Sequence, residues 1–277
     1  MNCPVCAKTC DELLTVCGSC GSFTGFPNVR LAESLLETEA LDSRYSDALI
    51  SADGRNSLEA LLKFEDAVRN SGVVVAMNVA RLRSMATIRG ELYSNYDLAV
   101  RASTRRPAST SNDQHRRTVD AKMWGVAASE IRYGALSLDG KGLSSYGICY
   151  VTLGDNFIAH RTSVLERNSF DFLEDVKIGE EAPAGFRSSW HSRYKVAVTK
   201  CEPRIGSGTA SSDFPQVLLK PSTSRATDEF IEVHIYGPFD FEAFKSVRIA
   251  DGPKTTADKV SLDIARQYVL KAGKTWV

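Results

Sequence analysis

The chain lacks any apolar run that approaches the roughly 20 residues needed to cross a membrane as a helix. Its first ten residues, MNCPVCAKTC, also lack the basic and then apolar pattern of a secretory signal. These two absences argue against a membrane protein and against export. We therefore expect a soluble, cytoplasmic protein that needs no membrane.

The chain also lacks a charge bias of either sign. Its 34 Lys and Arg residues balance its 34 Asp and Glu residues over 277 positions. Hydrophobic residues make up 43% of the chain and charged residues 25%, which is ordinary for a globular protein. Because the whole molecule carries no net field, any contact with nucleic acid must depend on a local patch.

Several motifs that announce a catalytic chemistry are missing. The sequence has no Gly-x-x-x-x-Gly-Lys phosphate loop, no His-Glu-x-x-His and no Gly-x-Ser-x-Gly. It has only four histidines, at 115, 160, 191 and 234, and they are far apart. A ribonuclease that works with a pair of histidines would have to use His160 or His191 together with His234.

Cysteine is abundant only at the N-terminus, where five of the seven cysteines lie within the first twenty residues. Cys3 and Cys6 form one Cys-x-x-Cys pair, and Cys17 and Cys20 form a second. Two such pairs predict a tetrahedral site for Zn²⁺ made of four thiolates. Because four protein ligands leave no position for water, the zinc would be structural. Cys10 is a spare thiol in this interpretation.

The pattern divides the chain into four segments: a zinc ribbon (1–25), a helical segment (26–100), a basic linker (101–125) and a C-terminal domain (126–277). Apolar spacing predicts helices over 29–50, over 56–72 and, from a Val-rich stretch, over 73–89. In the second of these, Asn56 and Glu59 form a capping box and Gly72 is the stop. Residues 101–122 are rich in Ser, Thr and Arg, which predicts an exposed linker.

From Val126 the sequence takes on the alternation and turn residues of β structure. We predict strands over 130–138, 146–153, 156–166, 193–200, 216–220, 229–237 and 245–250, and a terminal helix over 261–273. The predicted fold class is α+β, with a mostly antiparallel C-terminal domain.

The stretch DEFIEVHIYGPF, residues 228–239, has an unusual polar face. Ile231, Val233 and Ile235 alternate on one side, whereas Glu232 and His234 fall on the other. A carboxylate within a strand is costly unless it faces water or has partners. We therefore expect Glu232 to share a cleft with Arg132 of an earlier strand and with Thr162 or Ser163.

The order of these motifs resembles bacterial and phage-type ADP-ribosyltransferase domains of toxin-like proteins. The resemblance is carried by Arg132-Tyr133-Gly134, by a Tyr-Gly, Val-Thr-Leu, Arg-Thr-Ser and Asn-Ser segment, and by FIEVHIYGPFDFEAFKSVRI, and it covers residues 130–250. In such domains an Arg strand precedes a Ser/Thr segment, and a late strand carries the catalytic Glu. The resemblance implies a transferase that moves ADP-ribose from NAD to a macromolecule.

The resemblance implies a role for each site residue. Glu232 would stabilise the oxocarbenium-like state that forms when the nicotinamide–ribose bond breaks. Arg132 would hold a phosphate or ribose hydroxyl of NAD, and Thr162 or Ser163 would position Glu232. The backbone at Gly134 would also belong to the NAD site. Tyr133 or Tyr146 would stack on nicotinamide.

Two positions depart from the family pattern. Phe230 stands where the arginine-modifying branch has Glu or Gln, and His234 stands where the type of domain that this sequence resembles most has Gln. His234 would act as a base, contact NAD or be inert. The ribbon and the basic linker favour nucleic acid, RNA or DNA, over protein as the acceptor. A toxin of this kind would also leave room for an antitoxin or another regulatory partner.

Two other classes of function compete with this hypothesis. One is a metal-independent ribonuclease-type toxin in which His160 or His191 works with His234 and Glu232. The other is an adaptor without enzymatic activity, in which the zinc ribbon and the β domain only bind a partner.

Overall fold

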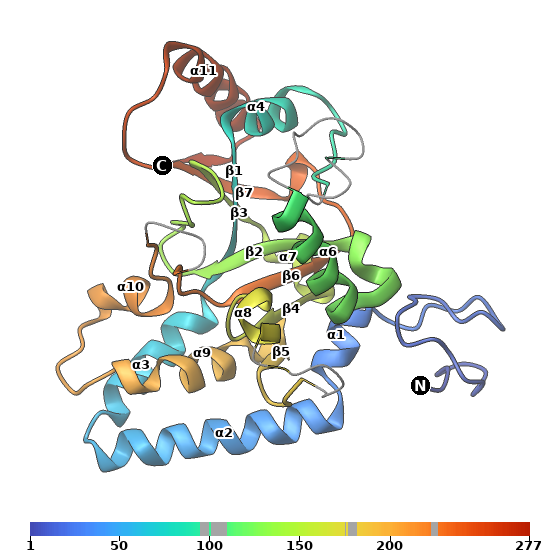
Figure 1. Ribbon diagram of the computed structural model, residues 1–277. Helices are drawn as coiled ribbons and strands as arrows, with labels where there is room; N and C mark the ends of the chain where they lie inside the picture. The colour runs from blue at the N-terminus through green and yellow to red at the C-terminus, as the bar shows by residue number, and fades with distance from the viewer. Residues whose placement is uncertain (95–99, 101–109, 175, 177–181, 223–226) are drawn as a thin grey trace.

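The computed structural model describes residues 1–94, 100, 110–174, 176, 182–222 and 227–277, and for residues 110–113 only the backbone. It contains a mixed arrangement of helices around one eight-stranded sheet (Figure 1). The strands are β1 (Gly72–Met77), β2 (Ile131–Ser137), β3 (Cys149–Leu153), β4 (Thr162–Leu165), β5 (Arg187–Ser189), β6 (Glu232–Tyr236), β7 (Phe244–Ile249) and β8 (Thr275–Trp276). The prediction of a mixed fold with a mostly antiparallel sheet is therefore confirmed.

The strands follow the order β5-β4-β6-β2-β1-β3-β7-β8. Every neighbouring pair is antiparallel except β7 and β8, which run parallel. The helices are α1 (Pro27–Ala32), α2 (Leu35–Gly54), α3 (Leu58–Arg69), α4 (Val79–Thr87), α6 (Thr110–Trp124), α7 (Asp155–Ile158), α8 (Ser169–Glu174), α9 (Arg193–Cys201), α10 (Phe214–Leu218) and α11 (Thr256–Lys271). Among the described residues, no helix has both the length and the apolar character needed to cross a membrane.

The Val-rich stretch predicted as a helix over 73–89 begins instead with the central strand β1. Val73, Val74 and Val75 are almost fully buried, and β1 is hydrogen-bonded to β2 on one side and to β3 on the other. A run of β-branched residues that is buried on both faces is typical of a central strand. The segment predicted as a helical spacer thus contributes a strand to the same sheet as the C-terminal half.

Several other predicted elements are wrong. The predicted helix 29–50 is two helices, α1 and α2, with Ser34 as the N-cap of α2. Asn56 does not cap α3, because it has a positive φ of 54° and Ser57 takes the N-cap position. Gly72 opens β1 and does not end the helix.

In the C-terminal half, two predicted strands are helices. The predicted strand 193–200 is α9, in which Ala197 and Cys201 are buried one turn apart. The predicted strand 216–220 overlaps α10, which starts with Pro215 in its first turn. Only Thr162–Leu165 of the predicted strand 156–166 is extended, after the short helix α7 and a 3₁₀ turn.

The predicted basic linker contains a helix. Residues 101–109 lie outside the described residues, but Thr110–Trp124 form α6. Val119, Met123 and Trp124 of α6 are buried in a small apolar cluster with Phe172 and Leu173 of α8. The linker prediction fails here because a few apolar residues at helical spacing outweigh a polar composition.

We predict that Gly147→Ala destabilises the fold by about 3 kcal/mol. A Cβ at Gly147, where φ is +154°, would lie 2.4–2.8 Å from backbone atoms of Met77, which cannot move without disturbing β1. Gly273→Ala is the matched control, because φ is +72° there and nothing lies within 4 Å, so only about 1 kcal/mol is expected. Urea unfolding of both variants measures the difference. Equal losses would contradict the close packing of residue 147 on β1.

Lys200 of α9 connects the end of β4 to the start of β6. Its Nζ donates to the backbone oxygens of Glu166, at 2.7 Å, and Phe230, at 2.6 Å. Burial lowers the pKa of Lys200 from 10.5 to about 8. Between these two pH values the unfolded chain holds a proton on this amine that the folded chain has lost, so stability rises with pH across the window.

We therefore expect the free energy of unfolding of the wild type, relative to Lys200→Met, to rise by about 3 kcal/mol from pH 8 to pH 10.5. The comparison with the variant cancels the contribution of all other titrating groups. Urea unfolding at half-unit pH steps measures it. A difference that is flat or falls over this window would show that the amine is not desolvated by the fold.

Candidate functional site and metal centre

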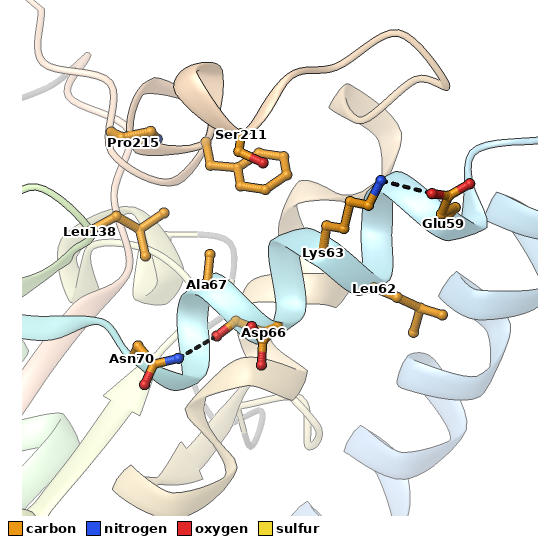
Figure 2. A pocket seen from close by; sticks show the side chains of 10 residues that line it. Glu59, Leu62, Lys63, Asp66, Ala67, Asn70, Leu138, Ser211 and Pro215 are labelled. Carbon is orange, nitrogen blue, oxygen red and sulfur yellow. Dashed lines mark hydrogen bonds and ion pairs between the residues drawn. The ribbon is translucent and has the colours of Figure 1, made fainter.

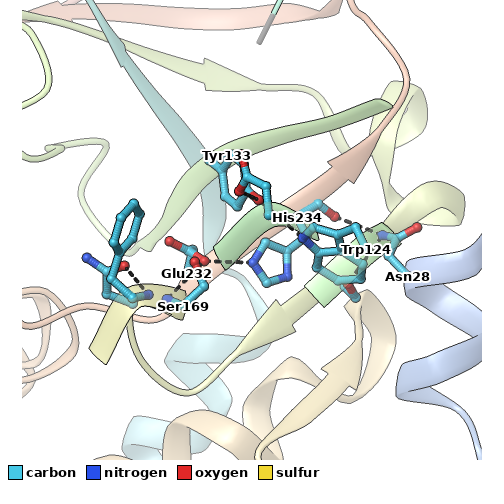
Figure 3. A network of polar contacts seen from close by, with 10 residues as sticks. Asn28, Trp124, Tyr133, Ser169, Glu232 and His234 are labelled. Atoms are coloured by element: carbon cyan, nitrogen blue, oxygen red, sulfur yellow. Dashed lines mark hydrogen bonds and ion pairs between the residues drawn. The ribbon is translucent and has the colours of Figure 1, made fainter. Parts of the chain in front are cut away.

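Glu232 and His234 form a buried polar pair on β6 (Figure 3). Only 6% of Glu232 and 2% of His234 is exposed, and His234 Nε2 lies 2.7 Å from Glu232 Oε1. The backbone N–H of Ser169, the first residue of α8, donates to the same carboxylate oxygen at 3.3 Å. The carboxylate thus lies outside bulk water and is held by an imidazole and an amide.

An aromatic and acidic layer from β2 and α6 covers this pair. The rings of Trp124 and Tyr133 meet the His234 ring edge-on, with centroids 4.8 Å and 5.4 Å away. The Tyr133 hydroxyl donates to Asp120 Oδ1 at 2.6 Å and accepts from Trp124 Nε1 at 3.1 Å. These two hydrogen bonds join α6 to β2 directly over His234.

The burial of this layer shifts its acid–base properties. Desolvation raises the pKa of Asp120, although the Tyr133 hydroxyl and Arg116 act in the opposite direction. Desolvation also raises the pKa of Tyr133 well above its ordinary value, and the nearby charges of Asp120 and Glu232 add to the effect. Tyr133 therefore stays a phenol at neutral pH and serves as a hydrogen-bond donor. The Glu232–His234 pair and the layer above it can therefore hold and transfer protons within a site that largely excludes water.

The prediction that Arg132 and Thr162 share a cleft with Glu232 is wrong. Both are paired across the sheet with Ile235, whereas Glu232 is paired with Ala135 and Leu165, so they point to opposite faces. Arg132 is 3% exposed and donates to the backbone oxygens of Tyr93 and Ser129 at 3.1 Å and 2.7 Å. The Thr162 hydroxyl donates to the backbone oxygen of Ile158.

Of the other four predicted site residues, two lie on the face of the sheet that carries Glu232 and His234, and two lie elsewhere. Tyr133 and Ser163 are the cross-strand neighbours of His234, so they share its face of the sheet. Gly134 lies where β1 comes close, because a Cβ there would meet a Val73 methyl group at 2.9 Å. Tyr146 packs against Phe230, with ring centroids 6.3 Å apart, in a separate small apolar cluster.

Sequence reasoning missed Asp120, Trp124 and Asn28. The first two lie in the segment that composition assigned to a linker, and the spacing of Val119, Met123 and Trp124 was the available signal for a helix. Nothing local marks Asn28, which reaches the site from α1 near the N-terminus (Figure 3). Its contacts join residues more than a hundred positions apart, which only the tertiary fold reveals.

The remaining histidines lie elsewhere on the described part of the chain. His160 and His191 are exposed, and the ring contacts of His234 are with Trp124 and Tyr133. His115 packs against Phe170 and lies 3.9 Å from Glu174. Among the described residues, the hydrogen bond and ring contacts of the His234 side chain are with Glu232, Trp124 and Tyr133, and none is with another histidine.

An open cavity of about 680 Å³ lies between α3 and the segment around α10 (Figure 2). Glu59, Lys63, Asp66 and Asn70 line its α3 wall, and Glu59 and Lys63 are already paired with each other at 2.7 Å. None of the residues around Glu232 lines it. This cavity is therefore separate from the Glu232–His234 pair on β6.

The four cysteines predicted as zinc ligands come together near the N-terminus. The Sγ atoms of Cys3, Cys6, Cys17 and Cys20 all lie within 4.8 Å of one another. The Cys3–Cys20 and Cys6–Cys17 separations are 3.6 Å and 3.7 Å, and Zn–S bonds of about 2.3 Å at tetrahedral angles would require about 3.8 Å. This group could bind a metal ion such as zinc.

The backbone around the cysteines also suits a metal. The amide N–H groups of Val5 and Ser19 point at the sulfurs of Cys3 and Cys17, each at 3.4 Å. The contact with Ser19 is the largest cause that lowers the pKa of Cys17 to about 6, so this thiolate is present at neutral pH. Burial raises the pKa of Cys10 to about 11. A backbone contact at Lys8 lowers the pKa of Cys6, one of the four, but contacts with the neighbouring thiols outweigh it and raise this pKa to about 12, so position and not pKa sets Cys10 apart.

We predict that the purified chain carries about one zinc ion per molecule, as a four-thiolate site requires. Cys17→Ser should abolish the bound zinc, because three thiolates and a hydroxyl hold it far less tightly. Cys10→Ser is the matched control and should retain it. Elemental analysis by mass spectrometry gives the metal content. Zinc retained in Cys17→Ser, or lost in Cys10→Ser, would assign the ligands differently.

We compared the chain with models of known protein families and with curated proteins. Neither comparison gives a match. The resemblance to ADP-ribosyltransferases thus rests on the short motifs of the sequence, and a function has to be argued from the chemistry of the β6 site and the cysteine cluster.

Proposed function

We propose that the chain is an ADP-ribosyltransferase that moves ADP-ribose from NAD to a macromolecular acceptor. The observation that carries the proposal is the Glu232 carboxylate, which is buried on β6 and is hydrogen-bonded to His234 Nε2. A carboxylate that is held in place and shielded from water stabilises a developing positive charge far better than an exposed one. The ribosyl cation formed from NAD is such a charge.

In the proposed reaction the bond between nicotinamide and ribose breaks, and its electron pair leaves with nicotinamide. Glu232 stabilises the positive charge that develops on the ribose. The acceptor atom then forms the new bond to the same carbon and releases its proton to water. His234 fixes the orientation of Glu232 through the 2.7 Å contact. Tyr133 and Trp124 supply aromatic surface beside the pair for the nicotinamide ring.

Arg132 lies on the opposite face of the sheet from Glu232, so another cation has to bind the diphosphate of NAD. Arg116 of α6 lies on the side of Glu232 and His234, with its guanidinium 5.6 Å from the ring centres of Tyr133 and Phe170. We assign the phosphate contact to Arg116 in place of Arg132, because Arg116, unlike Arg132, comes from the element that covers the polar pair. A guanidinium suits phosphate oxygens in either position.

Access to Glu232 requires a movement of the elements that cover it. A side chain that is 6% exposed cannot meet a nucleotide in the arrangement described. Two kinds of contact hold α6 over the pair: the packing of its apolar residues and the two hydrogen bonds to the Tyr133 hydroxyl. We propose that α6 shifts when NAD binds, which would also exclude water once the site closes again.

For the metal centre we propose a structural zinc ion, with all four thiolates as ligands. Such ribbons bind nucleic acid or protein. Nucleic acid is our preferred acceptor, because a ribbon of this kind and the basic composition of residues 101–122 both suit phosphates. The ribbon lies next to the β6 site, since the ring centre of Phe26 is 5.3 Å from that of Tyr236.

A second candidate function follows from the same contact. The 2.7 Å approach of His234 Nε2 to Glu232 also suits general acid–base chemistry, as in a metal-independent nuclease that cleaves RNA. It is less favoured because the second histidine of such a mechanism is not beside His234 in the described part of the chain.

We expect Glu232→Gln to lower the consumption of NAD at least about 100-fold, because the amide keeps the shape and loses the negative charge. Release of nicotinamide and incorporation of labelled ADP-ribose into RNA, DNA or the protein itself measure the reaction. Glu174→Gln, an exposed carboxylate at the end of α8, is the matched control. Turnover by a folded Glu232→Gln variant at the wild-type rate would refute the assignment. Cleavage of RNA without NAD, lost in His234→Gln, would establish the nuclease instead.

A further inference from the structure

Asn28 is a buried amide that holds two strands of the sheet at His234. It lies in the first turn of α1 and is 1% exposed. Its Nδ2 group lies 3.0 Å from the backbone oxygen of His234, 3.1 Å from that of Arg161 and 3.2 Å from Ser163 Oγ. Its Oδ1 atom is buried and has no hydrogen-bond partner among the described residues. The amide is thus used as a donor toward β4 and β6 at the position of the polar pair.

The same short helix is bound on its other side to the cysteine module, the segment 1–25 predicted as a zinc ribbon. The Arg30 guanidinium donates to the backbone oxygens of Glu12 and Leu14, at 2.7 Å and 2.9 Å, and to that of Thr24 at 2.8 Å. These acceptors belong to the loop between the two cysteine pairs and to the residues just after the second pair. The position of α1 therefore depends on the fold of the module.

A second contact joins the module to β6. The Phe26 ring, between the module and α1, lies 5.3 Å from the Tyr236 ring and 5.8 Å from the His160 ring, measured between centres. Tyr236 is two residues from His234 on the same face of β6. Hydrogen bonds and ring contacts thus connect the module with the strand that carries Glu232 and His234.

A module of this size that is built on four thiolates folds only when its metal is bound. From these contacts we infer that the metal module and the Glu232–His234 pair are coupled, and that Asn28 is the positioning residue that transmits the coupling. Binding of the metal orders the module, the module places α1, and Asn28 fixes the peptide of His234. Loss of the metal therefore loosens the β6 site.

The coupling has a reciprocal consequence. If the metal stabilises the ordered arrangement of His234, then breaking the Asn28 contacts must weaken metal binding by the same factor. Couplings of this kind are typically worth a factor of about 5 to 150 in affinity. This prediction concerns binding and accessibility alone, so it holds whether or not the chain is an ADP-ribosyltransferase.

The test uses the full chain, loaded with zinc or depleted by a chelator under reducing conditions. Diethyl pyrocarbonate modifies accessible imidazoles, and peptide mass spectrometry reports the rate at each histidine. We expect zinc removal to raise the rate at His234 about tenfold, within the range of such couplings. His191 is exposed in the described structure and serves as the internal standard for the reagent, whereas His160 contacts Phe26 and does not.

Asn28→Ala should raise the rate at His234 even with zinc bound, abolish its dependence on zinc and weaken zinc affinity at least about fivefold in competition with a chelating dye. Leu31→Ala, at a partly exposed position of the same helix, is the matched control and should behave as the wild type. Wild-type protein whose His234 reacts equally with and without zinc would overturn the inference. An Asn28→Ala variant that keeps the wild-type dependence on zinc would overturn it too, because zinc would then act through general unfolding.

Discussion

The hydrogen bond between Glu232 and His234 sets the conditions that the surrounding structure has to meet. A carboxylate removed from water is unfavourable unless polar groups replace the water. Here His234 and the amide of Ser169 replace it, and each comes from a different part of the chain. The aromatic rings above then exclude solvent. Removing any of these layers would leave a charged or polar group buried without its partner, which costs more than the contact itself contributes.

The alternation of side chains along the strands decides which residues can join this pair. Tyr133 and Ser163 flank His234 because they are its cross-strand neighbours. Arg132 and Thr162 are one residue away in sequence and therefore on the opposite face. The family resemblance gave these two residues a role beside Glu232, and the register of β2, β4 and β6 separates them from it. The proposal consequently turns to α6, which supplies Asp120, Trp124 and Arg116 to the correct side.

Many hydrogen bonds connect the cysteine module, through α1, to the sheet. Arg30 donates to four backbone oxygens of the module, and Asn28 donates toward three acceptors at β4 and β6. Both residues lie on α1, which has only six residues. A helix this short has little stability of its own, so its position depends on the contacts at both sides. This dependence is the physical basis for the coupling that we infer between a metal at the four cysteines and the β6 site.

The sequence by itself determined the features that depend on local spacing. Two Cys-x-x-Cys pairs predicted the metal group, and alternation predicted β2, β3, β6 and β7, because a metal site and a half-buried strand each impose a short-range pattern. The tertiary structure decided the rest. The Val-rich stretch of β1 fits a helix or a strand, and only its two neighbours in the sheet make it a strand. The polar composition of α6 suggested no structure, and its few buried residues fold it against α8. Which groups meet around the Glu232–His234 pair was beyond sequence reasoning, because strand register and helix packing bring them together. The Ser169 amide contacts Glu232, Asn28 contacts the backbone of His234, and Asp120 binds the Tyr133 hydroxyl over the pair.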